Sequence, residues 1–194
     1  MPAKVIVAGI PGVGKTTVLQ ELETISSEKH IPVKVVNFGD IMNRIFKKRG
    51  IDLHRDHMRK QDLDLQTRIQ QQAARTISRM RGNNGLVVDT HMFVRTVDGL
   101  WPGTPKRVLD ALQPDLIVLI EATPEQVAKR RSQDAGRERE AHEVNNVQAD
   151  LEWSRYMASA NAVIAGIPIQ IVNNEEGQQH QTAEDLLKII QKLR

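Results

Sequence analysis

Four short apolar runs rich in β-branched residues stand out along the chain, and a fifth follows near its carboxyl end. The first four lack the alternation of apolar and polar positions that a half-exposed sheet shows, so they predict strands buried on both faces. Strands of this kind are typical of a parallel sheet covered by helices. The five runs are Val5 to Ala8, Val33 to Val36, Leu86 to Val88, Leu116 to Ile120 and Ile167 to Val172.

The segments between these runs have helical character and are long enough to form the crossovers that parallel strands require. In one of them, Thr123 followed by Pro124 indicates a capped helix start with proline at the first helical position. The alternation of strands and helices predicts a three-layer α/β fold. The expected helices cover residues 15–27, 39–48, 55–81 with a break, 105–112, 124–131, about 141–165 and 183–193.

Composition narrows the class of protein. A chain of 194 residues with 40% hydrophobic content suffices for one substantial core but is short for two, so one domain over residues 1–194 is expected. The sequence contains no cysteine, which excludes disulfides and thiolate zinc sites and is typical of a reducing setting. No run reaches the roughly 18 apolar residues of a membrane span, and the first residues do not resemble a signal peptide. We therefore expect a cytoplasmic protein with no membrane partner.

The segment from Gly9 to Thr16 matches the phosphate-loop pattern Gly-x-x-x-x-Gly-Lys-Thr, and it lies between an expected strand and an expected helix, the context that supports the pattern. Its three glycines permit backbone angles that turn successive N–H groups toward phosphate oxygens. Lys15 supplies a cation for the β- and γ-phosphates, and Thr16 offers a hydroxyl to Mg²⁺. The residues expected to bind the nucleotide are Gly9, Ile10, Pro11, Gly12, Val13, Gly14, Lys15, Thr16 and Thr17.

A carboxylate is expected at the same edge of the sheet. Asp89 directly follows the run Leu86 to Val88, and ligands of open α/β sheets gather at the carboxyl ends of the strands. This placement favours a second magnesium contact opposite Thr16, with a capping or turn aspartate as the alternative. His91, two residues later, is either a phosphate contact or a satisfied polar histidine.

Two stretches lie outside a minimal alternating core: residues 38–84, which are rich in Gln and Arg, and the charged segment 132–140. Both are expected beside the site, where mobile lids occur. Phosphoryl transfer between two nucleotides gathers many negative oxygens and requires several converging arginines, although any single helical arginine is by default a solvated one. The candidates are Arg59, Arg95, Arg130, Arg131, Arg137 and Arg139. Together these features predict a nucleoside-monophosphate kinase.

The residues that carry these features extend over almost the whole chain. They are Gly9 to Thr17, Asn37 to Asp40, Arg55 to Lys60, Asp89 to His91, Pro102 to Pro105, Arg137 to Arg139, Arg155-Tyr156 and Ala165-Gly166. In these segments the chain resembles the archaeal-type adenylate kinases. It departs from their pattern at Glu138, where the family tends to have Asn, and at Thr104, where it usually has an apolar residue.

The resemblance implies a P-loop fold on a five-stranded parallel sheet, with reversible, magnesium-dependent transfer of the γ-phosphoryl group of ATP to AMP, giving two ADP. It implies that the insertion carries Gly39 and Asp40 and binds AMP, and that Arg59 and Arg95 hold the AMP phosphate. The arginines implied to close over the transferring group are Arg131 and, on the lid, Arg137 and Arg139. Members of the family are often trimeric, so a homotrimer is expected.

The residues alone leave other functions open. A kinase for CMP, UMP or a small metabolite would share the core and differ in the pocket between Phe38 and Arg95. An RNA-associated P-loop ATPase would suit the pI of about 9.3, but aromatic residues make up only 3% of the chain and are not interleaved with the basic run, so nucleic acid is not an expected partner. A regulatory nucleotide-binding module would need Lys15 and Thr16 but no acceptor pocket.

Overall fold

The computed structural model describes residues 3–31, 33–51, 63–80, 85–96, 99–133 and 144–193. Its main sheet has five parallel strands in the order β2-β3-β1-β6-β7. All five expected strands are confirmed, with ends that shift by one or two residues. They are β1 (Lys4–Ala8), β2 (Lys34–Asn37), β3 (Leu86–Thr90), β6 (Leu116–Glu121) and β7 (Ile169–Asn173).

The three central strands form the middle of the core because their apolar runs are covered on both faces. Strands β3 and β6 are buried along their whole length, and β1 is buried from Val5 onward. The edge strand β7 is different, since it leaves the Ile171 side chain half exposed. The expectation of strands covered on both faces therefore holds for the three central strands. It is wrong for β2, the other edge strand and one of the four for which it was made, since Lys34 is exposed and Val35 and Asn37 are half buried.

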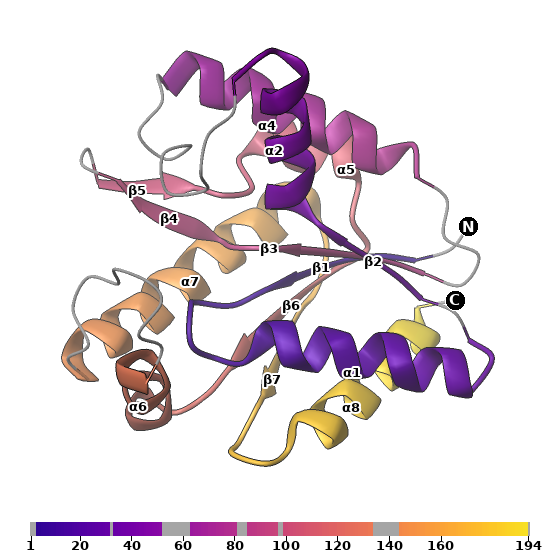
Figure 1. The fold of residues 1–194 in the computed structure, drawn as a ribbon, viewed down its shortest axis with the longest axis vertical. Helices are drawn as coiled ribbons and strands as arrows, with labels where there is room; N and C mark the ends of the chain where they lie inside the picture. The colour runs from indigo at the N-terminus through magenta and orange to yellow at the C-terminus, as the bar shows by residue number, and fades with distance from the viewer. Residues whose placement is uncertain are drawn as a thin grey trace.

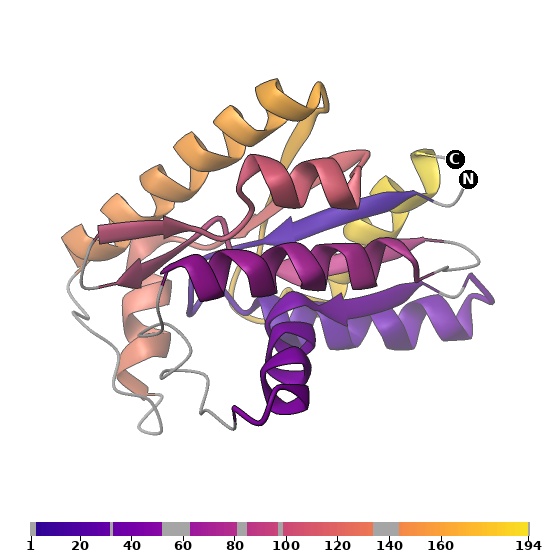
Figure 2. The same cartoon turned by 90° about the horizontal axis from the view of Figure 1, so that it is seen from above.

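Helices cover the two faces of the sheet (Figures 1 and 2). Helices α1 (Lys15–Glu28) and α8 (Gln179–Lys192) pack together on one face. On the other face α4 (Leu63–Ser78), α5 (Lys106–Leu112) and α7 (Val144–Ala165) pack in succession, with α2 (Phe38–Lys48) against α4. The three-layer α/β architecture predicted from the sequence is confirmed.

Local signals explain several helix boundaries. The expected cap before α6 (Pro124–Gln133) is present, since the Gln126 N–H donates to the Thr123 hydroxyl at 3.3 Å. Helix α8 begins at Gln179, four residues before the predicted start at position 183. Thr182 lies in its first turn, where it is buried and its hydroxyl donates to the Gln178 carbonyl at 2.9 Å. The expected helix 55–81 is described only from Leu63, and residues 52–62 lie outside the described part of the chain.

A hairpin between β3 and α5 was not predicted. Strands β4 (Phe93–Thr96) and β5 (Gly99–Pro102) pair antiparallel in a separate two-stranded sheet that projects from the carboxyl edge of the main sheet (Figure 1). Each strand has only four residues and its exposure is mixed, so neither gives a clear alternating pattern. Across the described residues, no helix is both long enough and apolar enough to cross a membrane.

Candidate functional site

The glycine loop lies at the carboxyl edge of the sheet, between β1 and α1. Register pairs Val7 of β1 with Asp89 of β3, so the loop that begins at Gly9 emerges beside the Asp89 carboxylate. Asp89 is the fourth of the five residues of β3, so it lies within the strand, one residue before its end, and not directly after the strand as the sequence suggested. Helix α1 starts at Lys15, directly after the loop, and its amino-terminal N–H groups therefore face the same edge.

The three loop glycines act in two ways. Gly12 and Gly14 have φ angles of 96° and 84°, the left-handed region that glycine adopts without steric cost. Gly9 does not have a positive φ, but a Cβ there would lie 2.6 Å from the Ile120 carbonyl oxygen and 2.8 Å from Cγ2 of Val13. The expectation that all three glycines supply special angles is therefore wrong for Gly9, which is required because β6 passes so close.

Lys15 and Asp89 form a buried ion pair beside the phosphate loop. The Lys15 ammonium donates to Oδ1 of Asp89, and both side chains are about nine-tenths buried. The second carboxylate oxygen accepts from Nδ2 of Asn37 at 2.5 Å. Asn37 also caps α2, because its Oδ1 accepts from the Asp40 N–H at 3.0 Å. A single carboxylate thus connects the phosphate loop to the helix that carries Gly39 and Asp40.

The backbone carbonyls on the back of the loop are held by side chains. Nε of Arg131 donates to the Pro11 carbonyl at 2.9 Å, and Nη1 of Arg130 donates to the Val13 carbonyl at 3.2 Å. Nδ2 of Asn174 donates to the same Val13 carbonyl at 2.7 Å. Because a trans peptide is planar, its C=O and N–H point in opposite directions, so outward carbonyls keep the N–H groups of the loop turned inward. This arrangement prepares the loop for an anion.

Asn174 is a site residue that the sequence analysis missed. It follows β7, is fully buried, and its backbone N–H donates to the Glu121 carbonyl at 2.7 Å. Its Oδ1 accepts from the Thr182 hydroxyl at 3.4 Å, so the amide orientation is fixed from both sides. The sequence offers no motif here, only a polar residue after an expected strand, which is common in loops.

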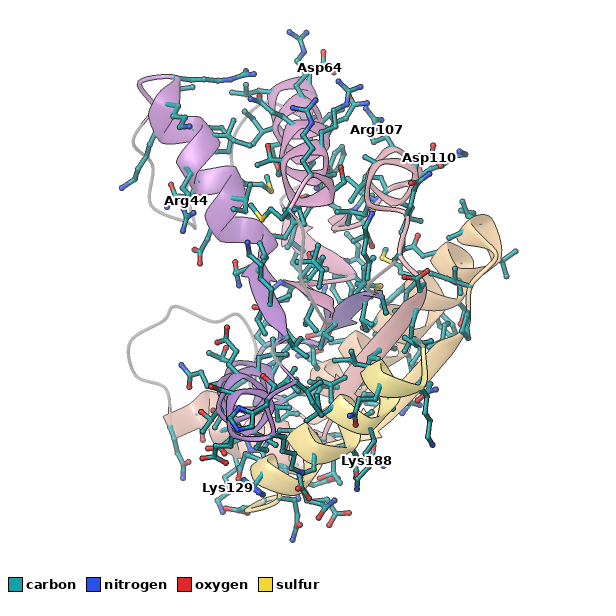
Figure 3. All side chains as sticks on the ribbon, turned by 90° about the vertical axis from the view of Figure 1, so that its right-hand side faces the viewer. Arg44, Asp64, Arg107, Asp110, Lys129 and Lys188 are labelled. Atoms are coloured by element: carbon teal, nitrogen blue, oxygen red, sulfur yellow. The ribbon has the colours of Figure 1, made fainter. Side chains whose placement is uncertain are left out.

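Arg131 lies on the buried side of α6, and Arg130 beside it is half buried. Arg131 is 4% exposed, whereas its neighbour Lys129 points to the surface (Figure 3) and pairs with Glu176 at 3.2 Å. Arg131 and Arg95 of β4 share the carboxylate of Asp150 on α7. The structure therefore brings two predicted phosphate-binding arginines, Arg95 and Arg131, to one carboxylate and one of them to the phosphate loop.

The remaining predicted residues are placed as follows. Thr16 and Thr17 are exposed in the first turn of α1, and Gly39 and Asp40 are half buried in the first turn of α2. His91 is half buried directly after β3. Arg59, Arg137 and Arg139 lie outside the described residues, as does most of the expected lid.

A second buried carboxylate ends β6. Glu121 is 4% exposed and accepts from Nε of Arg155 at 2.9 Å and from its Nη2 at 2.5 Å. The hydrogen bond to Glu121 raises the pKa of the Arg155 guanidinium above its ordinary value. This bidentate pair fixes α7 against the strand that passes closest to Gly9.

The donor set suits a magnesium ion that is held mainly by phosphate. The described residues contain no group of three or more His, Asp or Glu side chains that could hold a metal ion by themselves. Thr16 and Asp89 supply a hydroxyl and a carboxylate, the oxygen ligands that Mg²⁺ prefers, and phosphate oxygens and waters ordinarily complete its octahedron. The site therefore fits a metal that enters with a nucleotide.

Several known proteins are similar to this chain over nearly its whole length. A family model described as an AAA domain matches residues 8–148. The chain is 39% identical to the adenylate kinase of Methanoculleus marisnigri, over 96% of this chain and 97% of that protein. It is 38% identical to the adenylate kinase of Methanococcus aeolicus, with 96% of each protein covered, and 38% identical to that of Thermoplasma acidophilum, with 95% and 97% covered.

Solved structures show the same fold at much lower sequence identity. A shikimate kinase from Bacteroides thetaiotaomicron superposes with a TM-score of 0.56 at 12% identity, covering 97% of this chain and 98% of that one. A shikimate kinase from Acinetobacter baumannii in complex with shikimate gives a TM-score of 0.55 at 15% identity, with 98% and 93% covered. At these identities the likeness establishes a shared fold and nothing more.

Proposed function

The chain belongs to the adenylate kinase family, and we propose that it catalyses the reversible, magnesium-dependent transfer of the γ-phosphoryl group of ATP to AMP, giving two ADP. An oxygen of the AMP phosphate attacks the γ-phosphorus as the bond to the β-phosphate oxygen breaks. Little covalent chemistry falls to the protein in such a transfer, so positioning and charge neutralisation dominate. The observation that carries the proposal is the phosphate loop, whose carbonyls are held outward next to a buried lysine.

The donor end of the reaction is assigned to the loop from Gly9 to Thr17. Its inward N–H groups would bind the β- and γ-phosphates, and Lys15 would neutralise charge that builds between them. In support, Lys15 is the first residue of α1, directly after the glycines of the loop, and its ammonium contacts the buried Asp89 carboxylate at the same edge of the sheet. Because Gly9 has no side chain, the loop can lie directly against the Ile120 carbonyl of β6 and the Val13 side chain.

The acceptor end is assigned to α2, β4 and the segment between α2 and α4. Gly39 and Asp40 would contact AMP, and Arg59 and Arg95 would bind its phosphate. In support, Arg95 is held by Asp150 through Nε and Nη2, so the remaining edge of its planar guanidinium fork is directed elsewhere. Arg131 would neutralise the transferring group together with Arg137 and Arg139 of the lid.

Magnesium is proposed to be held by the Thr16 hydroxyl and, through water, by Asp89. When bound, the ion would supply positive charge at the β- and γ-phosphate oxygens. Asn37 keeps the Asp89 carboxylate oriented through its 2.5 Å hydrogen bond. In the absence of nucleotide, the Lys15 ammonium and the Asp89 carboxylate neutralise each other's charge.

The rest of the chain would control access to this site. We propose one domain, residues 1–194, in which the insertion 38–84 and the lid 132–140 close on the nucleotides and exclude water, so that the γ-phosphoryl group reaches AMP instead of being hydrolysed. We also place this enzyme in the cytoplasm.

A homotrimer is the proposed assembly. Support comes from the apolar side chains that α7 and the adjoining edge strand leave exposed, because exposed apolar patches commonly mark interfaces. They are Trp153, Tyr156, Val163, Ile164 and Ile171. Light scattering after gel filtration should give the mass of three 21.9 kDa chains, and Val163→Glu should lower it; a wild-type mass of one chain contradicts the trimer.

A coupled assay for ADP formation tests the reaction. Wild-type protein with ATP and Mg²⁺ should form ADP rapidly with AMP and far more slowly with CMP, UMP or GMP. Lys15→Met should remove the activity while the thermal unfolding transition persists, because the lysine is replaced by a side chain of similar length. Faster transfer to another monophosphate, or near-normal turnover by Lys15→Met, would contradict the proposal.

A further inference from the structure

Asp150 lies between two arginines that come from separate parts of the fold. Its Oδ1 accepts from Nη2 of Arg95 at 2.5 Å and from Nε of the same side chain at 3.1 Å. Its Oδ2 accepts from both Nη atoms of Arg131 at 3.3 Å. Asp150 belongs to α7, Arg95 to β4 and Arg131 to α6, so one carboxylate joins the hairpin to the helix beside the phosphate loop.

The cluster of Arg95, Asp150 and Arg131 contains two cations, and the carboxylate between them supplies their counter-charge. The Arg131 side chain is 4% exposed, and a buried guanidinium is costly unless a counter-charge and hydrogen bonds satisfy it. The Asp150 side chain is only 10% exposed, whereas the Arg95 side chain is 48% exposed. A buried carboxylate therefore holds one buried cation and one cation that reaches solvent.

The cluster is also connected to the phosphate loop. Arg131 uses its Nη atoms for Asp150 and its Nε for the Pro11 carbonyl at 2.9 Å. A change at Asp150 is therefore transmitted in two directions, through Arg131 to the loop and through Arg95 to the hairpin. The Nε and Nη2 edge of Arg95 faces Asp150, which fixes the direction of the rest of its guanidinium fork.

We propose that Asp150 is a positioning residue, which sets Arg95 at the acceptor phosphate and Arg131 at the donor loop as a pair with fixed separation. This inference rests on the proposed function, since it needs phosphates at both ends. Asp150 offsets part of the repulsion between the two cations before the nucleotides bind. Because each oxygen serves one arginine, a side chain of the same shape with a single acceptor oxygen presents it to only one of the two.

Asp150→Asn tests this directly, because it keeps the size of the side chain and turns an –NH₂ group toward one of the two arginines. We expect kcat/KM for AMP to fall by about tenfold to a hundredfold, the range for losing a hydrogen bond to a charged group. The KM for ATP should rise as well, through Arg131, but by no more than about threefold, since Nε of Arg131 still reaches the Pro11 carbonyl and the loop keeps its bonds to Arg130 and Asn174. The matched control is Asp110→Asn on α5, whose carboxylate points outward (Figure 3), is 58% exposed and pairs with Lys106 one turn away. Both kinetic constants should keep their wild-type values in this variant.

A double-mutant cycle with Arg95→Met separates positioning from general stability. If Asp150 acts through Arg95, adding Asp150→Asn to Arg95→Met should lower kcat/KM for AMP much less than it does in the wild type. Effects that simply multiply would overturn the inference, as would an Asp150→Asn enzyme with wild-type values. If Asp150→Asn does not fold, Asp150→Glu, which keeps the charge but displaces the carboxylate, enters the same cycle with the same two outcomes.

Wild-type protein in the same assay separates this inference from the proposed function. Wild-type protein that forms no ADP from ATP and AMP contradicts the function and the inference together. An active wild type with no coupling between Asp150 and Arg95 contradicts the inference alone.

Discussion

Replacing Asn174 by alanine removes one support from the back of the phosphate loop. The side chain is fully buried, and its Nδ2 donates to the Val13 carbonyl at 2.7 Å. After the change, Val13 keeps the longer 3.2 Å bond from Arg130, and the Thr182 hydroxyl keeps its bond to the Gln178 carbonyl at 2.9 Å. No buried group loses every partner, so the protein should fold.

The magnitude follows from these bonds. Loss of one good buried hydrogen bond and one weaker bond should lower the free energy of unfolding by about 1–2 kcal/mol. For a domain of this size that corresponds to a Tm lower by about 2–8 °C. If restoring the loop on binding costs a similar free energy, the KM for ATP should rise about five- to thirtyfold, since 1.4 kcal/mol is a factor of ten.

Asn161→Ala is the matched control for Asn174→Ala. Nδ2 of Asn161 donates to the Thr104 hydroxyl over the same distance of 2.7 Å, but this bond joins α7 to the turn before α5 and does not touch the phosphate loop. Thermal unfolding and ATP titrations of the coupled assay should show a similar loss of Tm for both variants and a raised KM for ATP only in Asn174→Ala. Equal KM values for ATP would refute the view that Asn174 prepares the loop.

Three further predictions concern the loop, the Glu121 pair and the metal. Gly14→Ala should lower both Tm and ATP affinity, because φ is 84° there and a Cβ would collide with the Asn174 amide; wild-type ATP titrations would contradict this. Arg155→Gln should lower the free energy of unfolding by about 1–3 kcal/mol, because Glu121 stays buried without its cation, and an unchanged denaturant midpoint would contradict this. EDTA should abolish ADP formation, excess Mg²⁺ should restore it, and Tm without nucleotide should not change, since Thr16 and Asp89 hold no metal alone.

The central strands could be predicted because burial on both faces leaves a continuous apolar run. Strand β6, with six buried residues, gives such a run, whereas the hairpin β4 and β5 was missed because its strands are short and partly exposed. The sequence pair Asp98-Gly99 is of a type favoured in hairpin turns, and it was the feature of the sequence that could have indicated the hairpin. The turn residues therefore indicated a hairpin, whereas the pattern of apolar residues did not.

The phosphate loop could be predicted because its residues are consecutive in the chain. The distant side chains that hold it and its arginines in place could not be predicted. Gly9 to Thr16 are consecutive, so the requirement for glycine and lysine at fixed spacing is visible in the sequence. Asn174 and Asp150 act on residues far away in the chain, 161 positions from Val13 and 55 positions from Arg95. Such contacts depend on strand order and helix packing, which a lone polar residue in a loop or helix does not encode.

The reverse reaction distinguishes an adenylate kinase from the other candidate enzymes. Purified protein incubated with ADP and Mg²⁺ alone, with the products separated by chromatography, should form ATP and AMP in equal amounts, and Lys15→Met should form neither. A simple ATPase would produce no ATP from ADP, and a kinase for another acceptor would not generate AMP. Formation of ATP and AMP in a one-to-one ratio is the result predicted here, and the absence of either product would contradict it.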